Sequence, residues 1–154
     1  MSNFPTETQT IPSDSTAGQL CTFHLGPLYL GLPVVVVQEV IRFQEMTPVP
    51  LSGPEISGLI NLRGAIVTAI DLRRRLRLPD RPEGQLPMNV VVRDQDGAVS
   101  LLVDEIGDVL EVHRGQYETA PDNLDPHVRD AISGVYKLPG QLLLALDHKI
   151  ATEV

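Results

Sequence analysis

The chain of 154 residues has the size of one compact domain, or of two very small ones that share a core. Its formal charge of −8, from 12 Lys and Arg against 20 Asp and Glu, opposes binding to nucleic acid and to anionic lipid. A single cysteine excludes an internal disulfide, and no Cys or His spacing is that of a zinc site. Plentiful Gly and Pro with 4% aromatic residues favour short strands and turns.

No apolar run approaches the roughly 20 residues that span a bilayer. The first residues also lack the basic flank and apolar region of a signal peptide. We therefore expect a soluble protein in the reducing cytoplasm, with no direct insertion into a membrane.

Residues 1–18 are rich in Thr, Ser and Pro and contain no Lys or Arg, which predicts a disordered tail. From Leu20 onward, short apolar segments follow one another at the spacing of an all-β sandwich or barrel. Residues 20–25 and 28–32 alternate across a Gly-Pro turn and predict a hairpin. The run 34–37 fits either a short helical turn after proline or a continuing strand. Residues 40–43 predict the next strand.

Residues 54–57 carry Pro and an acid in a first turn, which predicts a single helical turn. The segment 66–70 is apolar on both faces except at Thr68, so we expect a strand buried on both sides. Asp71 is placed to cap the following helix, with Leu72 and Leu76 on one face. The same periodicity predicts that the side chains of residues 73–75 largely face away from the core.

The second half of the chain predicts two further hairpins. Residues 88–93 and 98–103 flank an Asp-Gln-Asp-Gly turn, and residues 132–138 and 141–146 flank a Pro-Gly turn. Another strand is expected at 108–113. The total of about nine or ten short strands exceeds one five-stranded barrel, so the sequence predicts two small barrels with an apolar boundary.

The sequence offers no catalytic constellation. It contains no phosphate-binding Gly-Lys-Ser/Thr loop, no Gly-x-Ser-x-Gly elbow and no His-Glu-x-x-His pair. His24 is interpreted as a structural residue of a strand, Cys21 as a core thiol, and Asp104, Glu105 and Asp108 as a solvated acidic edge. We therefore expect no catalytic residue, no metal and no cofactor. The alternative is a small hydrolase or transferase in which Asp71, Asp104 and His113 converge.

Half of the basic residues lie between positions 63 and 81, which favours a solvated face or a protein contact over an RNA patch in so acidic a chain. Arg63 lies in a tight polar turn between two apolar segments. There it either ties the two barrels together or contacts a partner. Glu39, among aliphatic neighbours, either pairs internally or marks the polar part of a contact surface.

Three segments carry a resemblance to a known family. They read Val-Gln-Glu-Val at 37–40, Gly-Leu-Ile-Asn-Leu-Arg-Gly-Ala-Ile-Val at 58–67 followed by Ile-Asp-Leu-Arg at 70–73, and Leu-Val-Asp-Glu-Ile-Gly-Asp-Val-Leu at 102–110. In this order and spacing the chain resembles the CheW family of chemotaxis coupling proteins over about residues 19–150. The turn with its arginine, followed by the apolar strand, is the most specific part.

The resemblance implies an all-β fold of two five-stranded SH3-like barrels that share an apolar core, with short helical turns. We expect the first barrel at about 19–64 plus the C-terminal strand region, the second at about 65–140, and a C-terminal end at 151–154. It also implies a non-catalytic adaptor that needs no cofactor.

Family members bridge the cytoplasmic tip of methyl-accepting chemoreceptors to the regulatory domain of a CheA-type histidine kinase, in arrays at the membrane. The resemblance assigns no kinase-binding residue in this chain. An adaptor of a non-flagellar pathway, such as gliding, pilus motility or second-messenger output, is the alternative. The positions that correspond to receptor coupling are Val37, Glu39, Gly58, Arg63, Val103, Ile106 and Val109.

Overall fold

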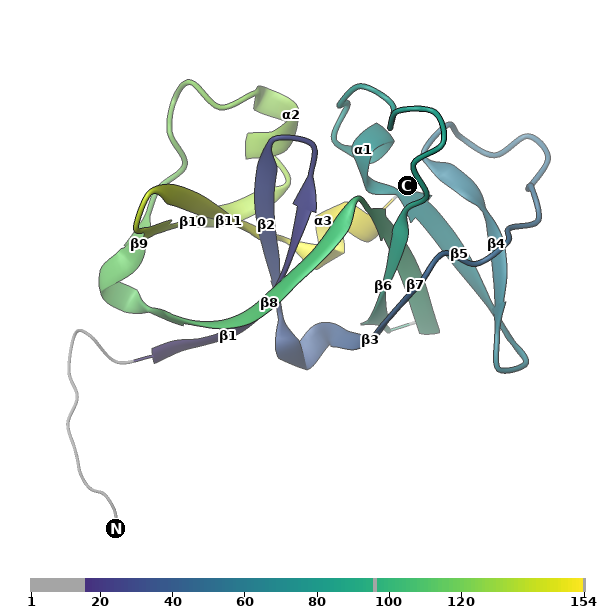
Figure 1. Ribbon diagram of the computed structural model, residues 1–154, viewed down its shortest axis with the longest axis horizontal. Coiled ribbons are helices and arrows are strands. Elements are labelled where there is room, and N and C mark those ends of the chain that lie inside the picture. The colour runs from purple at the N-terminus through teal and green to yellow at the C-terminus, as the bar shows by residue number, and fades with distance from the viewer. Residues whose placement is uncertain (1–15, 96, 154) are drawn as a thin grey trace, which may run out of the picture.

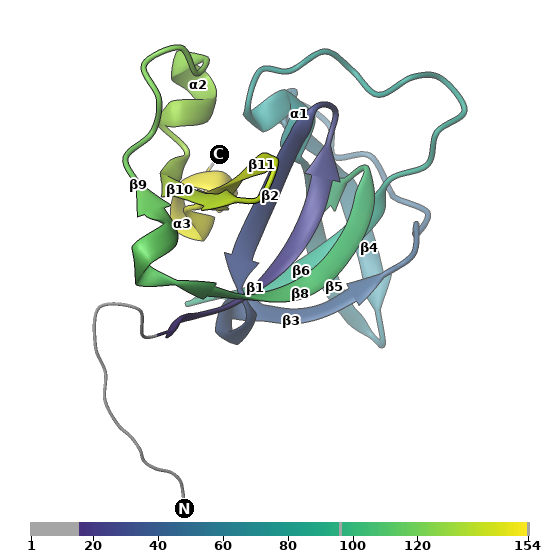
Figure 2. The same ribbon diagram turned by 60° about the vertical axis from the view of Figure 1, so that its left-hand side comes forward.

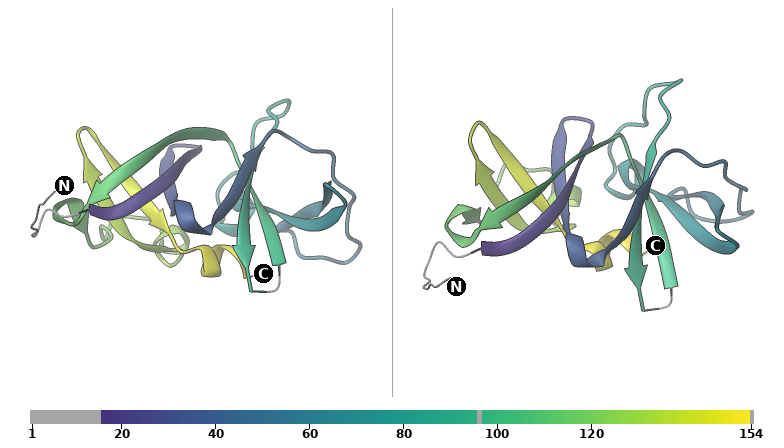
Figure 3. Two further views of the ribbon diagram at one scale, coloured as in Figure 1. Left: turned by 90° about the horizontal axis from the view of Figure 1, so that it is seen from below. Right: turned by 60° about the horizontal axis from the view of Figure 1, so that its bottom comes forward.

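The computed structural model describes residues 16–95 and 97–153, and its strands form two sheets that lie side by side (Figures 1 and 3). The first sheet has six strands in the order β8-β1-β2-β11-β10-β9, and the second has five in the order β3-β6-β7-β5-β4. The predicted all-β fold of two small barrels is confirmed, and the sixth strand of the first sheet is a two-residue addition, β9. The predicted tail falls mostly outside the described residues, but 16–18 form the start of β1, which pairs with β8.

The strands of the first sheet are β1 (Thr16–Leu25), β2 (Leu28–Pro33), β8 (Glu105–His113), β9 (Tyr117–Glu118), β10 (Ile132–Leu138) and β11 (Gln141–Leu146). Those of the second are β3 (Val37–Ile41), β4 (Ile56–Leu62), β5 (Ala65–Asp71), β6 (Met88–Asp94) and β7 (Gly97–Val103). The short helices are η1 (Val34–Val36), α1 (Leu72–Arg75), η2 (Arg114–Gln116), α2 (Pro126–Arg129) and α3 (His148–Thr152).

The sheets divide the chain differently from the expected barrels. The expected first barrel was to include residues up to 64, yet β3 pairs with β6 and β4 pairs with β5, so the whole stretch 37–103 belongs to the second sheet. The chain then crosses back at Asp104, and β8 pairs with β1. The paired residues of β1 and β8 lie some 90 positions apart in the chain. The spacing of apolar residues predicts that a strand is present but does not show which strand it pairs with.

Each sheet has its own way of closing. In the first, β9 follows β8 through the single turn of η2, so the two outermost strands are consecutive in the chain. In the second, Thr47 forms an isolated antiparallel bridge with Leu59 of β4, through backbone hydrogen bonds of 2.9 and 2.8 Å. The segment after β3 thereby joins the two outermost strands, β3 and β4, as barrel closure requires.

The largest apolar cluster draws on both sheets. It contains Phe23 and Leu30 from the first sheet together with Ile70, Val90 and Leu101 from the second, all at most 1% exposed. Two smaller clusters lie one in each sheet. The expected shared core is therefore present, and burial of apolar surface at about 25 cal/mol per Å² holds the two barrels together as one unit.

A buried ionic cluster joins the barrels beside this core. Arg73 donates to both carboxylate oxygens of Asp104, from Nε at 3.0 Å and from Nη2 at 2.6 Å. Arg81 Nε donates to Oδ1 at 2.8 Å, and the Gly26 amide at the β1–β2 turn donates to Oδ2 at 2.7 Å. Asp71 Oδ1 lies 3.6 Å from Arg81 Nη2, so two carboxylates balance two guanidinium groups.

This cluster corrects two expectations. Asp104 is buried, not part of a solvated acidic edge, and Arg73 does not face away from the core. The periodicity of α1 places Leu72 and Leu76 correctly in the core, but it cannot show that a carboxylate lies opposite the next residue. Asp71 caps α1 by accepting the Arg73 amide, as predicted.

Two local predictions fail where strand pairing overrides propensity. Residues 54–57 do not form a helical turn, because Ile56 already pairs with Ile70 and the Glu55 carbonyl accepts the Asp71 amide. The strand at 66–70 is buried from Val67 onward, apart from the half-buried Thr68. Ile66 is exposed, since it lies near the tip of the β4–β5 hairpin beyond the end of the core.

We expect the Asp104 cluster to control stability. The Asp104→Asn variant leaves two guanidinium groups balanced by one carboxylate, that of Asp71, so it should lower the free energy of unfolding by about 3 kcal/mol, a fall of about 10 °C in melting temperature. Circular dichroism melts measure this, with Asp80→Asn as control, because Asp80 is an exposed acid paired with Arg74. Equal melting temperatures for the two variants would contradict the role of the cluster.

The cluster also predicts an acid dependence. Burial alone raises the pKa of Asp104, but hydrogen bonds from Arg73, the Gly26 amide and Arg81 outweigh burial and lower the pKa from 3.8 to about 2. A depressed carboxyl pKa contributes stability above the unfolded value and loses it as the pH falls through the folded value. Acid titration should show this loss between pH 3.8 and about 2 in the wild type and not in Asp104→Asn.

Candidate functional site

The candidate residues fall into two sets, and the first lies where the sheets meet. Val103 is buried in the shared core, while Val37 of β3 and Ile106 of β8 are half-buried and pack against that core. Val109 is 55% exposed. β3 and β8 are each the outermost strand of their sheet, and Figures 1 and 2 show both on the same side of the molecule. These strands place partly exposed aliphatic side chains at the boundary of the two barrels.

The pairing register adds one residue to this set. Cys21 pairs with Val109 and Phe23 pairs with Ile106, so all four side chains lie on one face of the first sheet. Cys21 is partly exposed, which corrects its interpretation as a core thiol, and burial raises its pKa. We define the junction surface as Cys21, Val37, Ile106 and Val109.

The second set is an ion pair that bridges the outermost strands of the second barrel. Arg63, in the β4–β5 turn, donates from Nη1 to Glu39 Oε2 at 2.7 Å and from Nη2 to Oε1 at 2.5 Å. The Arg63 side chain is 71% exposed and that of Glu39 is 17% exposed. Hydrogen bonds from Arg63 lower the pKa of Glu39, and the same bonds raise that of Arg63. Of the two interpretations of Glu39, the structure therefore shows the internal pair, which Glu39 forms with Arg63 of the same barrel.

Arg63 does not tie the two barrels together, because its partner lies in the same sheet. The tie between barrels is made by Arg73 and Arg81 instead. Arg63 itself has a left-handed backbone with φ of +53°, and the Asn61 side chain stabilises this turn by accepting the Gly64 amide. The turn points the guanidinium at Glu39 while keeping most of it in solvent.

Gly58 has a geometric reason to be glycine. A Cβ at this position would lie 2.7 Å from the carbonyl oxygen of Thr47, on the segment that closes the barrel through its bridge to Leu59. Real Cβ atoms do not approach backbone oxygen so closely, so a side chain would push that segment away. Gly58 thus belongs with Glu39 and Arg63 to the closure of the second barrel.

A bulge in β3 separates the two sets. Val37 pairs with Val92 and Glu39 pairs with Val91, so one extra residue, Gln38, lies on β3 between two consecutive pairs. Since Val91 and Val92 point to opposite faces, Val37 and Glu39 do so as well. β3 therefore presents Val37 to the junction surface and Glu39 to the closure of the barrel.

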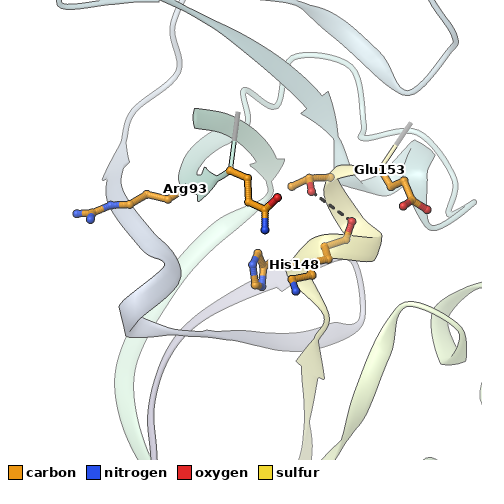
Figure 4. A pocket seen from close by; sticks show the side chains of 6 residues that line it. Arg93, His148 and Glu153 are labelled. Atoms are coloured by element: carbon orange, nitrogen blue, oxygen red, sulfur yellow. Dashed lines mark hydrogen bonds between the residues drawn. The ribbon is translucent and has the colours of Figure 1, made fainter. Parts of the chain in front are cut away.

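Another hollow of the surface contains none of these residues. Figure 4 shows Arg93, His148 and Glu153 around an open pocket of about 620 Å³, with the Arg93 guanidinium directed away from His148. Its lining mixes both charges without an ordered constellation. Within residues 16–95 and 97–153, no group of three His, Cys, Asp or Glu side chains has the geometry to hold a metal ion. The ion cluster of Asp71 and Asp104 does not include His113, contrary to the hydrolase alternative.

The architecture defines a class of protein, the double SH3-like barrel with a shared core. A solved structure of this fold, "scaffolding protein TtCheW from Thermoanaerobacter tengcongensis", superposes with a TM-score of 0.78 at 24% identity, covering 89% of this chain and 93% of that one. A family model, the CheW-like domain, matches residues 19–152. The chain belongs to the CheW family and is a chemotaxis adaptor.

Curated relatives agree with this assignment. "Chemotaxis protein CheW" of Bacillus subtilis is 31% identical over 132 residues, which cover 86% of this chain and 85% of that protein. The protein of the same name from Thermotoga maritima is 29% identical over 137 residues, with coverages of 88% and 89%. No helix in the described part of the chain has the length and apolar character to cross a bilayer.

Gly58 provides a test of the closure geometry. We expect Gly58→Ala to lower the melting temperature by about 5 °C, because overpacking a closed site costs on the order of 1–3 kcal/mol. Gly115→Ala is the matched control, since a Cβ there meets no atom within 4 Å. A Gly58→Ala variant as stable as the control would show that the segment at Thr47 yields without cost.

Proposed function

We propose that this adaptor couples the cytoplasmic tip of methyl-accepting chemoreceptors to the regulatory domain of a CheA-type histidine kinase, without catalysis of its own. The observation that carries the proposal is the junction surface, where half-buried aliphatic side chains continue outward from the core shared by both barrels. Surface apolar groups arranged in this way favour a protein partner over a small molecule. Membership of the CheW family supplies the class of that partner.

The shape of the junction surface supports a helical partner for receptor coupling. Ile106 and Val109 lie on one face of β8, three residues and so up to ~10 Å apart along the strand. On a helix, residues i and i+7 are separated by about 10.5 Å. A helical hairpin with an apolar heptad stripe can therefore place successive apolar side chains on both, with Val37 completing the contact from the second barrel. Val103 is fully buried, so in this proposal it supports the surface from the core and does not touch the partner.

The ion pair of the second barrel supports an orienting role in the same coupling. A guanidinium carries five N–H donors, of which Arg63 uses one from each terminal nitrogen on Glu39. The remaining donors of this exposed group can bind carbonyl or carboxylate groups of a partner. Gly58 acts in this proposal by permitting the closure that fixes the pair in place.

The same proposal places the protein in the cytoplasm, recruited to receptor arrays at the membrane. Its effect on the kinase would be conformational, since an adaptor biases activity only by binding the active and inactive arrangements with different free energies. The kinase contact is a second surface, and no residue is assigned to it here. In the alternative function, an adaptor of a pathway that controls gliding, pilus motility or a second messenger, the protein would use the same surfaces.

Titration calorimetry tests the proposal directly. The full chain is titrated with the regulatory domain of each CheA-type kinase from the same cell, and separately with receptor-tip helical hairpins. We expect saturable one-to-one binding to one kinase domain and to at least one hairpin. Absence of binding to every kinase domain, with a folded chain, would contradict the proposal and indicate a CheW-like double barrel recruited to another partner.

Arg63→Ala separates partner binding from stability. We expect about tenfold weaker receptor-hairpin binding, the effect of losing a charged hydrogen bond. The melting temperature should change by only ~3 °C, because exposed ion pairs contribute little to stability. Arg93→Ala is the matched control, an exposed arginine outside both sets. A large fall in melting temperature with binding intact would instead assign Arg63 a purely structural role.

A further inference from the structure

We propose that Thr22 is a positioning residue for receptor coupling: its hydroxyl holds the bulge in β8 that brings Ile106 and Val109 onto one face. The inference rests on the proposed function and deepens it, since it says what builds the surface that the partner meets. Thr22 itself is only 1% exposed, so in this proposal it acts through β8 and not by contact with the partner.

The bulge follows from the register of β1 and β8. Cys21 pairs with Val109 and Phe23 pairs with Ile106, so two residues of β8 lie opposite Thr22 alone. In a regular strand, residues three apart point to opposite faces. The extra residue restores the common face of Ile106 and Val109. Without this bulge, one of the two side chains would turn away from the junction surface.

The Thr22 hydroxyl lies at the bulge and bonds on both sides. Oγ1 donates to the backbone carbonyl of Asp108 at 2.5 Å and accepts from the Tyr29 hydroxyl at 3.1 Å. The Tyr29 ring is in turn stacked on His24, with ring centroids 4.7 Å apart. A chain of contacts thus runs from β2 through β1 to the Asp108 carbonyl at the bulge.

The opposite side of the bulge is shaped to fit the same hydroxyl. A Cβ built on Gly107 would lie 2.5 Å from Thr22 Oγ1, so only glycine lets the oxygen reach the Asp108 carbonyl. β8 is the outermost strand of its sheet and pairs only with β1, so no strand on its other side supports the two unpaired residues of the bulge. The regular pairs on either side of the bulge fix the rest of β8, and the Thr22 hydroxyl is the side-chain contact that holds the bulge itself.

The test compares Thr22→Val with Thr22→Ser in the full chain. Valine keeps the size of threonine and removes the hydroxyl, whereas serine keeps the hydroxyl. For Thr22→Val we expect about tenfold weaker binding to a receptor-tip hairpin in calorimetry, with kinase-domain binding within about twofold of wild type. Thr22→Ser should restore hairpin binding to within about twofold. Backbone NMR contacts that pair Cys21 with Val109 should be lost in the valine variant alone.

Gly107→Ala gives a second route should Thr22→Val fail to fold. Its new methyl group displaces the hydroxyl, so it should also weaken hairpin binding about tenfold. Combined with Thr22→Ala, where no hydroxyl remains to be displaced, it should add nothing further. Non-additivity of this kind is expected only for residues that act on one another.

Val109→Asp distinguishes a failure of the proposed receptor contact from a failure of the positioning role of Thr22. Should Val109→Asp leave hairpin binding unchanged, the junction surface is not the receptor contact and the proposed function fails there. Should Val109→Asp abolish binding while Thr22→Val and Gly107→Ala bind as wild type, the positioning role of Thr22 alone is overturned. Equal weakening by the valine and serine variants would overturn it as well, because the hydroxyl would then not be the cause.

Discussion

The buried carboxylate of Asp104 is the constraint on which the arrangement of this molecule depends. It lies where the chain leaves the second sheet for the first, and it accepts hydrogen bonds from Arg73 and Arg81 on one side and from the Gly26 turn on the other. Its own amide donates to the His24 carbonyl, which fixes the crossing backbone. Apolar burial is non-directional and would tolerate sliding of one barrel on the other. The ionic contacts are directional, so they set where β3 and β8 stand relative to one another.

The second barrel depends on a different device, the closure between its two outermost strands. The backbone bridge at Leu59, the close approach at Gly58 and the ion pair of Glu39 with Arg63 all act across the same seam. Of the three, the ion pair uses groups that solvent or a partner can reach. A residue that matters to coupling can therefore matter because it keeps the seam closed, because it contacts the partner, or for both reasons. Measurements of stability and of binding separate these effects.

The sequence predicted local structure well and long-range pairing poorly. The hairpins of β1 with β2, β6 with β7 and β10 with β11 were predicted, since a turn joins neighbours in the chain. The pairing of β1 with β8 was not predicted, because a local sequence pattern does not identify a pairing strand that is distant in the chain. Arg73 illustrates the same limit of the sequence analysis. Helical periodicity predicts which face of α1 a residue occupies, but it does not show that the Asp104 carboxylate lies opposite Arg73. The bulges at Gln38 and Gly107 were also invisible, although they decide which candidate residues share a face. The resemblance assigned positions such as Gly58 to receptor coupling but did not indicate their geometry. The alternation of the strand predicted the face on which Thr22 lies, but nothing in the sequence indicated the role of its hydroxyl.

The position of the chain's one cysteine has a practical consequence. Cys21 is partly exposed beside Val109, on the face where we place the receptor contact. Because burial raises its pKa, the thiol is mainly protonated at neutral pH, and we expect slow alkylation, which mass spectrometry can follow. The molecule thus carries a built-in attachment point for a single fluorophore or spin label. Any protein that covers this face, whatever its pathway, would report its arrival as protection of one sulfur atom.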